Sequence, residues 1–217
     1  MKKDALFYIG TGVLVVATIG LFAMFSSRDS DNVQNTSTPT PAGNASPTPR
    51  YTKVPDQFLE ADATYHVKLS TTAGDITIKL DQKAVPVAAN NFAFLVKDGF
   101  YNGTPFHRTI SGFMIQGGDP TGTGMGGPGY KFADEPFTGE YKRGIVAYAN
   151  SGPNSNGSQF FIMHADYALQ KDYIIFGEVT EGMDTVDAIA AAPKVPGGEG
   201  STPVTPVTVT SAVLIKL

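Results

Sequence analysis

The chain has 217 residues, a formal net charge of −4 and a pI near 5.3. That length suffices for one sizeable domain plus accessory segments, and an acidic balance without any Lys/Arg cluster argues against nucleic-acid binding through phosphate neutralisation. Cysteine is absent, which excludes disulfides, thiolate metal ligands and a cysteine nucleophile.

The first predicted element is a membrane-spanning helix. Residues 5–25, which start at Ala5 and stop at Phe25, form an uncharged, mostly apolar run of 21 residues after two lysines. A helix needs about 20 such residues to cross a bilayer, and the bulky residues at the end of the run do not suit signal-peptide cleavage. We therefore predict a short cytoplasmic N-terminus (residues 1–4), an uncleaved signal-anchor and a cell-membrane location with the remaining chain extracytoplasmic. A cleaved signal peptide is the alternative.

Residues 26–61 are predicted to form a disordered linker. The composition shifts to Ser, Thr, Pro, Asn and Gly, with proline at every second position over 38–41 and again over 46–49. Too few apolar side chains remain to offset the conformational entropy of the chain. We interpret this segment as a spacer that holds the following domain, residues 62–217, away from a membrane.

The domain itself is predicted to consist of many short strands and two helices. Alternating apolar residues predict strands over 66–70 and 75–80, joined through a turn at Gly74. A helix is expected to begin at Pro86 and to end near Gly99. The other predicted elements are strands over 112–116, 144–149, 159–164, 174–179 and 207–217 and a second helix over 183–190. This pattern is typical of an antiparallel barrel or sandwich.

One stretch, residues 106–119, carries the first candidate chemistry. Arg108 stands five residues before Phe113 and Met114, and Gln116 follows them. Arginine keeps its charge at physiological pH, so it donates hydrogen bonds without exchanging protons. Such a group aimed at an apolar pocket suits a reaction that needs a donor and no proton shuttle, as rotation about a prolyl bond does. The structural alternative is a strand–turn–strand with a solvated arginine.

A second stretch, residues 144–162, offers a surface for an extended peptide. A strand is predicted to end at Ala149, and a polar loop of small residues then leads into a strand that opens with Gln159 and two phenylalanines. Small side chains let another backbone approach closely. Asn150 presents backbone and side-chain groups that can pair with that backbone.

Together with Phe176-Gly177-Glu178-Val179, the two stretches resemble the cyclophilin family of peptidyl-prolyl cis–trans isomerases, with the motifs in the family's order. The short 119–130 loop is similar to that of bacterial members. The resemblance implies a closed eight-stranded antiparallel barrel capped by two helices. It also implies a non-covalent isomerase without metal or cofactor that binds proline-containing polypeptides. Together with the predicted signal-anchor, the resemblance predicts an enzyme that assists the folding of exported proteins, and nothing in the sequence requires more than a monomer. A catalytically weak peptide-binding module or holdase chaperone is the alternative, and a stalked surface adhesin is a third.

The resemblance also implies roles for individual residues. Arg108 matches the catalytic arginine, Gln116 matches an amide that bonds the substrate backbone, and Gln159 is expected to orient Arg108. Tyr173 stands where animal members carry histidine, and Ala168 stands where an aromatic residue is usual, which thins one pocket wall and puts cyclosporin binding in doubt. The candidate substrate-binding residues are Phe113, Met114, Gln116, Ala149, Asn150, Gln159, Phe161, Leu169 and Tyr173.

Other catalytic classes find little support in the sequence. His66, His107 and His164 form no short metal-ligand motif. Ser158 does not lie in the Gly-x-Ser-x-Gly pattern of hydrolases. The glycine-rich residues 122–129 lack the Lys-Ser/Thr pair of a phosphate-binding loop.

Overall fold

The computed structural model describes residues 50–196 and 200–217. The predicted signal-anchor over 5–25 and most of the predicted linker lie outside these residues. Within the described ranges, no helix is both long and apolar enough to span a membrane.

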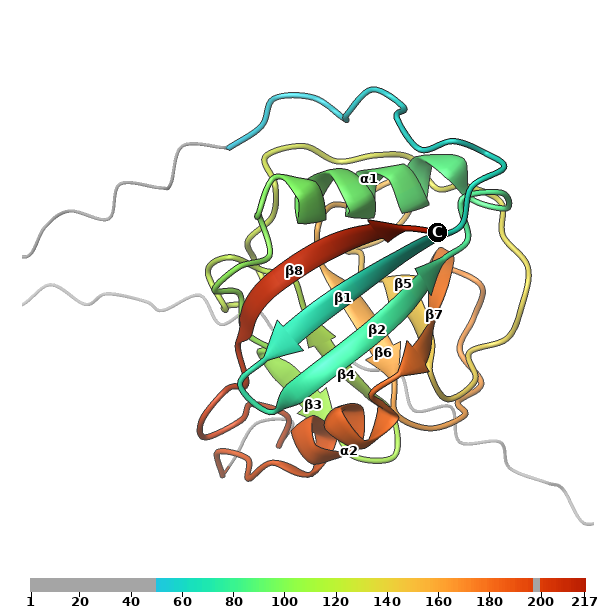
Figure 1. Ribbon diagram of the computed structural model, residues 1–217. Helices are drawn as coiled ribbons and strands as arrows, with labels where there is room; N and C mark the ends of the chain where they lie inside the picture. The colour runs from blue at the N-terminus through green and yellow to red at the C-terminus, as the bar shows by residue number, and fades with distance from the viewer. Residues whose placement is uncertain (1–49, 197–199) are drawn as a thin grey trace, which may run out of the picture. The chain divides into compact units, whose positions relative to one another are not determined.

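Eight antiparallel strands form one curled sheet in the order β3-β4-β6-β5-β7-β2-β1-β8 (Figure 1). The strands are β1 (Tyr65–Thr71), β2 (Gly74–Leu80), β3 (Arg108–Ile110), β4 (Met114–Gly117), β5 (Ile145–Tyr148), β6 (Phe160–Met163), β7 (Ile175–Glu181) and β8 (Val209–Lys216). The predicted strands are all present, with ends that shift by a few residues. Strand β3 was not among them, because three residues are too few to show a period.

The prediction of a closed barrel is confirmed only in part. The edge strands β3 and β8 share no continuous ladder. Their ends approach instead through an isolated bridge between Pro105 and Thr208 and through the Phe106 N–H, which donates to the Val207 carbonyl at 2.9 Å. Proline has no N–H to give to a ladder, so Pro105 limits regular pairing at this seam. The sheet is therefore a curled half-barrel with a partly bonded seam.

Two helices lie at opposite ends of the curled sheet (Figure 1): α1 (Pro86–Lys97) and α2 (Met183–Ala191). Helix α1 begins with proline at its first turn, as predicted. It ends where Gly99 adopts a positive φ of 68°, and the Phe100 N–H reaches back to the Leu95 carbonyl at 2.9 Å. This arrangement is a Schellman motif, which glycine favours because it lacks a Cβ.

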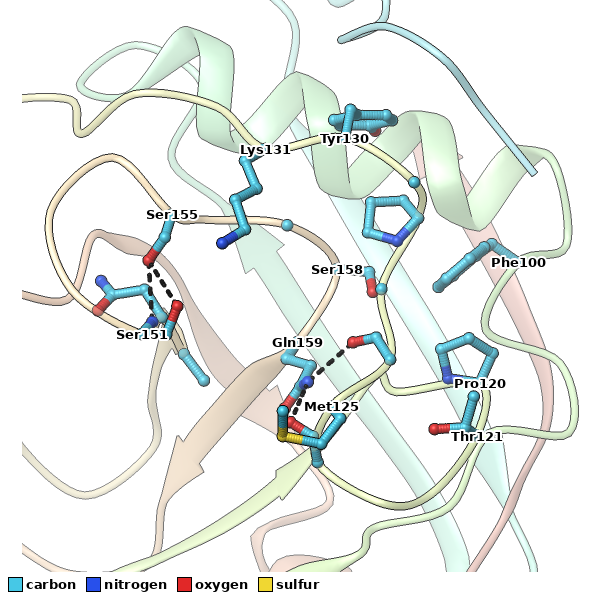
Figure 2. Close-up of a pocket in the computed structure, with 18 of the residues that line it drawn as sticks. Phe100, Pro120, Thr121, Met125, Tyr130, Lys131, Ser151, Ser155, Ser158 and Gln159 are labelled. Atoms are coloured by element: carbon cyan, nitrogen blue, oxygen red, sulfur yellow. Dashed lines mark hydrogen bonds between the residues drawn. The ribbon is translucent and has the colours of Figure 1, made fainter. Parts of the chain in front are cut away.

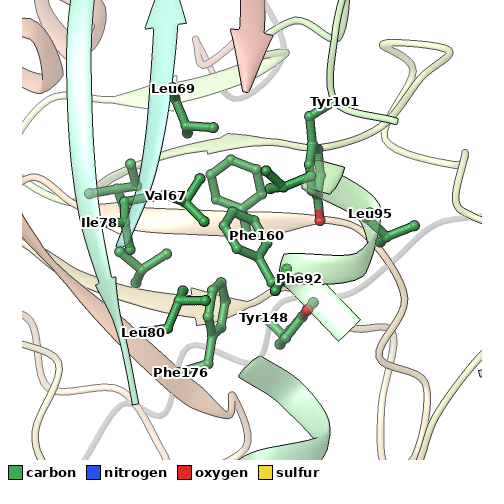
Figure 3. Close-up of a cluster of buried hydrophobic side chains, with 14 of the residues drawn as sticks. Val67, Leu69, Ile78, Leu80, Phe92, Leu95, Tyr101, Tyr148, Phe160 and Phe176 are labelled. Carbon is green, nitrogen blue, oxygen red and sulfur yellow. The ribbon is translucent and has the colours of Figure 1, made fainter. Parts of the chain in front are cut away.

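The main core lies between the inner face of the sheet and α1. Figure 3 shows aliphatic side chains of β1 and β2 gathered around Phe92 of α1 and around phenylalanines of β6 and β7. The Phe92 ring lies 5.3 Å from that of Phe160 and 4.8 Å from that of Phe176. Tyr148 is also fully buried, and its hydroxyl donates to the Ala88 carbonyl at 3.1 Å. Aromatic packing thus fixes α1 on the strands that carry the site described below.

Residues 50–59, the N-terminal strap, pack on the domain although they fall within the predicted linker. The Tyr51 N–H donates to the Pro128 carbonyl at 3.1 Å, and its hydroxyl donates to Asp98 at 2.5 Å. Further along, Leu59 is 6% exposed and its N–H donates to the Asn90 side chain at 3.2 Å. The strap packs on the domain because Tyr51 and Leu59 bury apolar surface there. The overall composition of the segment is polar and does not predict this packing.

Candidate active site

The outer face of the sheet carries a second, smaller apolar cluster. Side chains alternate between the two faces of a strand, so Phe160 and Ile162 join the main core while Phe161 and Met163 point outward. The same alternation on β4 sends Met114 outward. Because the buried apolar side chains of both described helices belong to the main core and none joins this cluster, the rim of the cluster stays half-buried. It consists of Ile110, Phe113, Phe137, Ile145, Ala149, Leu169 and Tyr173.

The candidate polar residues lie in a row across this face. Arg108 of β3 pairs with Gln116 of β4, Gln116 pairs with Phe161 of β6, and Phe161 pairs with Ala147 of β5. Directly paired residues project from the same face of an antiparallel sheet, with Cβ atoms about 4.5–5.5 Å apart. The guanidinium-bearing residue, the amide and the aromatic wall are therefore neighbours, although they are far apart in the chain.

The predicted walls of the proline pocket come together in the outer cluster. Met114 and Phe161 are 2% and 5% exposed, and they form its floor. Phe113, Leu169 and Tyr173 pack around them with partly exposed side chains. The Tyr173 ring meets that of Phe161 edge-on with centroids 5.6 Å apart. These residues form a continuous apolar surface that is partly open to solvent.

A further aromatic residue, Tyr167, belongs to this wall and was missed from the sequence. Its ring lies 4.5 Å from that of Phe113 at an angle of 41°, while half of the residue (51%) remains exposed. Ala168, the next residue, is exposed and adds no ring. The signal in the sequence was an aromatic residue one position before the expected one.

Next to the apolar cluster lies a pocket of about 810 Å³ between the 120–131 loop and the 149–159 segment (Figure 2). Four candidate substrate-binding residues line it: Gln116, Ala149, Asn150 and Gln159. Lys131 extends its side chain toward the pocket (Figure 2). The candidate site therefore combines a partly exposed apolar cluster with a pocket that has polar residues in its wall.

A buried carboxylate holds the glycine-rich wall of this pocket in shape. Asp119 is fully buried, and it accepts hydrogen bonds from Thr121 N–H at 2.7 Å, Gly124 N–H at 2.6 Å and Gly126 N–H at 3.1 Å. Burial acts to raise the pKa of the Asp119 carboxyl, but these bonds outweigh it and hold that pKa below its usual value. Any side chain at Gly126 is excluded because its Cβ would lie 1.9 Å from Asp119 Oδ1.

The side-chain amides of two candidate residues form hydrogen bonds to loops of the protein itself. Gln159 Nε2 donates to the carbonyls of Gly124 and Gly126, both at 2.9 Å, and Gln159 Oε1 accepts from Gln116 Nε2 at 3.0 Å. Asn150 Nδ2 donates to the Asp172 carbonyl at 2.8 Å. A peptide on this edge would therefore meet the backbone of 149–150 rather than the Asn150 amide. The hydrogen bond expected from Gln159 to Arg108 stays a prediction.

The histidines lie apart from one another in structural settings. His164 Nδ1 accepts from the Gly112 N–H at 2.9 Å and so fixes the turn between β3 and β4. Burial lowers the pKa of His107, which adjoins Arg108 in the chain. Among the described residues, no group of three or more His, Cys, Asp or Glu side chains is placed to hold a metal ion.

Comparison with known proteins agrees with this geometry. The family model described as "Cyclophilin type peptidyl-prolyl cis-trans isomerase/CLD" matches residues 66–214. The probable peptidyl-prolyl cis-trans isomerase B of Mycobacterium tuberculosis is 39% identical over 183 residues, which cover 76% of this chain and 58% of that protein. The peptidyl-prolyl cis-trans isomerase-like 3 of Dictyostelium discoideum is 46% identical over 134 residues, or 58% of this chain and 83% of that protein.

A solved structure is similar in fold as well as sequence. The cyclophilin type peptidyl-prolyl cis-trans isomerase of Cryptosporidium parvum has a TM-score of 0.65 and 37% identity, covering 70% of this chain and 98% of its own. The same protein crystallised in the presence of the dipeptide Ala-Pro gives a TM-score of 0.64 with 37% identity, covering 69% of this chain and 98% of its own. On its family match, its relatives and its curled eight-stranded sheet, the chain belongs to the cyclophilin-type peptidyl-prolyl cis-trans isomerases.

Proposed function

We propose that this chain is a peptidyl-prolyl cis–trans isomerase that acts on extended, proline-containing polypeptides. The observation that carries the proposal is the row across the sheet, which sets Arg108 and Gln116 beside the apolar cluster floored by Met114 and Phe161. The naming of the relatives as isomerases supports the enzyme over the holdase alternative.

The mechanism follows from the electronic structure of the amide. Rotation about a peptide bond meets a barrier of about 18–20 kcal/mol because the nitrogen lone pair is delocalised into the carbonyl. At the twisted transition state that lone pair is localised on the nitrogen. A donor that meets it only then stabilises the transition state selectively. In our proposal Arg108 supplies this donor without giving up a proton.

The apolar cluster serves to hold the proline ring during rotation. Phe113, Met114, Phe161, Leu169 and Tyr173 form an apolar surface on the outer face, where a pyrrolidine ring would exchange water for apolar contacts. With the ring held, the carbonyl before the proline rotates while Gln116 and the backbone of 149–150 hold the flanking peptide. Arg108 is the proposed catalytic residue and the others are proposed substrate-binding residues.

A protease-coupled isomerisation assay on an Ala-Pro peptide tests this function in the full-length chain. We expect the cis-to-trans rate to rise above the uncatalysed rate in proportion to protein concentration. A rate equal to the uncatalysed background, from protein that still binds the peptide, would favour the holdase alternative.

We further propose that the domain is tethered to a membrane and works on exported proteins as a monomer. The support is in the sequence: the apolar run over 5–25, the lysines before it, and the spacer composition that follows. Cell fractionation should recover the full-length chain with membranes, and protease added outside the cytoplasm should remove the domain. A soluble form that starts near Ser26 would instead indicate a cleaved signal peptide.

A further inference from the structure

The described chain begins at the edge of the larger pocket. Arg50 lines that pocket of about 810 Å³ together with Gln116, Ala149 and Gln159, all of which are candidate substrate-binding residues. The described chain thus starts, at Arg50, in the wall of the groove in which we place the substrate.

The point at which the chain reaches the pocket is fixed by several contacts. Arg50 pairs with Asp98 at 2.7 Å, and the Tyr51 backbone donates to the Pro128 carbonyl at 3.1 Å. The Tyr51 ring packs against those of Phe94 and Tyr130, with centroids 5.4 and 6.3 Å away. Pro128 and Tyr130 are themselves part of the pocket wall. The contacts of the strap therefore keep Arg50 beside the pocket.

The sequence before Arg50 has the chemistry that the site is proposed to bind. It contains four X–Pro pairs, at Thr38-Pro39, Thr40-Pro41, Ser46-Pro47 and Thr48-Pro49, and no charged residue from 32 to 49. The pocket wall contains the cations Arg50 and Lys131 and no carboxylate side chain. An uncharged segment meets no repulsion there.

The linker sequence is also long enough to reach the apolar cluster. Residues 41–49 span up to about 30 Å when extended, whereas a domain of this size has a radius of gyration of about 15 Å. We propose that the X–Pro segment 38–49 is an intramolecular ligand of the isomerase groove, which it occupies in competition with external polypeptides. This inference rests on the proposed function, and it makes the linker a regulator of that function.

The expected strength follows from effective concentration. A short flexible tether presents its ligand at a concentration on the order of 1 mM. A single X–Pro segment with a dissociation constant of about 1 mM would then fill about half of the sites, and four segments would fill more. Competition of this kind raises KM and leaves kcat unchanged.

The test compares two variants of the full-length chain in detergent micelles. In the first, Pro39, Pro41, Pro47 and Pro49 are changed to alanine, which removes every X–Pro bond of the segment. In the matched control, alanine replaces Gln34, Asn35, Ser37 and Asn44. We expect the proline variant to show a KM for an Ala-Pro peptide about two- to fivefold below wild type with the same kcat, and the control to match wild type.

Three outcomes overturn the inference. An unchanged KM in the proline variant would show that the linker does not compete, while wild-type activity would leave the proposed function intact. A KM that rises with protein concentration would assign the occupancy to the linker of a second copy. If neither the wild type nor any variant accelerates isomerisation, the proposed function fails. Competition by the linker is then tested by the binding of a fluorescent Ala-Pro peptide. Equal affinity of the wild type and the proline variant for this peptide rejects the competition.

Discussion

The two apolar clusters share the same strands yet differ in how they are covered. Phe160 and Phe161 are neighbours on β6, but Phe160 lies in the inner core against Phe92 of α1, whereas Phe161 lies in the outer cluster. The inner cluster is closed by a helix, and its members are almost all buried. The outer cluster ends in half-buried side chains such as Phe113 and Leu169. Alternate residues of one strand thus contribute to the closed core on one face and to the proposed ligand surface on the other.

The largest expected effect tests the stability half of this comparison. Phe160→Ala should lower the free energy of unfolding by about 3–5 kcal/mol, because it leaves a cavity in a dense core. That is a large share of the 5–15 kcal/mol typical of a whole domain. Phe161→Ala should cost less stability and should raise KM more. Urea unfolding of both variants checks the first statement, and equal losses of stability would show that the two faces do not differ as described.

The second prediction concerns the 120–131 loop, which forms one wall of the pocket. Asp119→Ala removes the acceptor of the Thr121, Gly124 and Gly126 bonds, and the net worth of a hydrogen bond to a charged group is about 1.5–3 kcal/mol. Because these loop residues are at least partly exposed, water can replace some of the lost bonds. We expect a loss of about 2–3 kcal/mol and faster amide exchange over 120–131. Exchange as slow as in wild type would mean that Asp119 does not organise the loop.

The same carboxyl predicts an acid dependence. Because the pKa of Asp119 is lowered in the folded protein, the unfolded chain binds the proton more tightly, and the stabilisation is present above the unfolded pKa of about 3.9. It is lost as the pH falls through the folded pKa. The free energy of unfolding of wild type should therefore fall more steeply below about pH 4 than that of Asp119→Asn. Parallel curves for the two proteins would contradict this.

Tyr167 provides a smaller test of the ligand face. Its ring contributes one aromatic contact to Phe113 and is half exposed, and such contacts are worth about 0.5–1.5 kcal/mol. We expect Tyr167→Ala to lower kcat/KM about two- to tenfold, with little change in Tm. Tyr167→Phe keeps the ring and should retain wild-type kinetics. If both variants behave like wild type, Tyr167 is not part of the wall.

His107 gives the smallest predicted effect. Its pKa is lowered by burial, so the unfolded chain binds the proton more readily and stability rises with pH through the unfolded pKa of about 6.5. The contribution is present above that pH and is lost as the pH falls toward the folded pKa. For His107→Asn, the free energy of unfolding should therefore change less with pH between about pH 7 and pH 5 than it does for the wild type. An equal pH dependence of the two proteins would show that His107 does not titrate as described.

The sequence predicted the strands and helices because their signals are local. Pro86 and Gly99 mark the ends of α1 through their own backbone preferences, and alternation marks β1 and β2. The closure of the sheet and the packing of the strap were not predictable in this way. The seam at Pro105 depends on residues about a hundred positions away, and a single tyrosine docks a segment whose composition is that of a linker.

The sequence predicted which residues form the candidate site better than it predicted the hydrogen bonds between them. The motifs around Arg108 and Phe161 were sufficient to name most of the cluster, because the family resemblance carries them together. The periodicity of a sequence does not show which group will form a hydrogen bond with a given side-chain amide. Hence the bonds of Gln159 to the glycine loop and of Asn150 to Asp172 emerged only from the structure. Tyr167 was missed for the related reason that loop length changes which residue reaches the wall.

The central claim is that Arg108 acts on the twisted amide while the apolar cluster holds the ring. The most direct measurement is kcat and KM for an Ala-Pro peptide with the full-length wild type, Arg108→Lys and Arg108→Ala, alongside the peptide affinity and Tm of each. Loss of one preorganised donor costs about 100- to 1,000-fold in kcat. We therefore predict a drop in kcat of that size for Arg108→Ala, a partial drop for Arg108→Lys, and peptide affinity and Tm close to wild type. A kcat for Arg108→Ala within a few-fold of wild type would contradict the account.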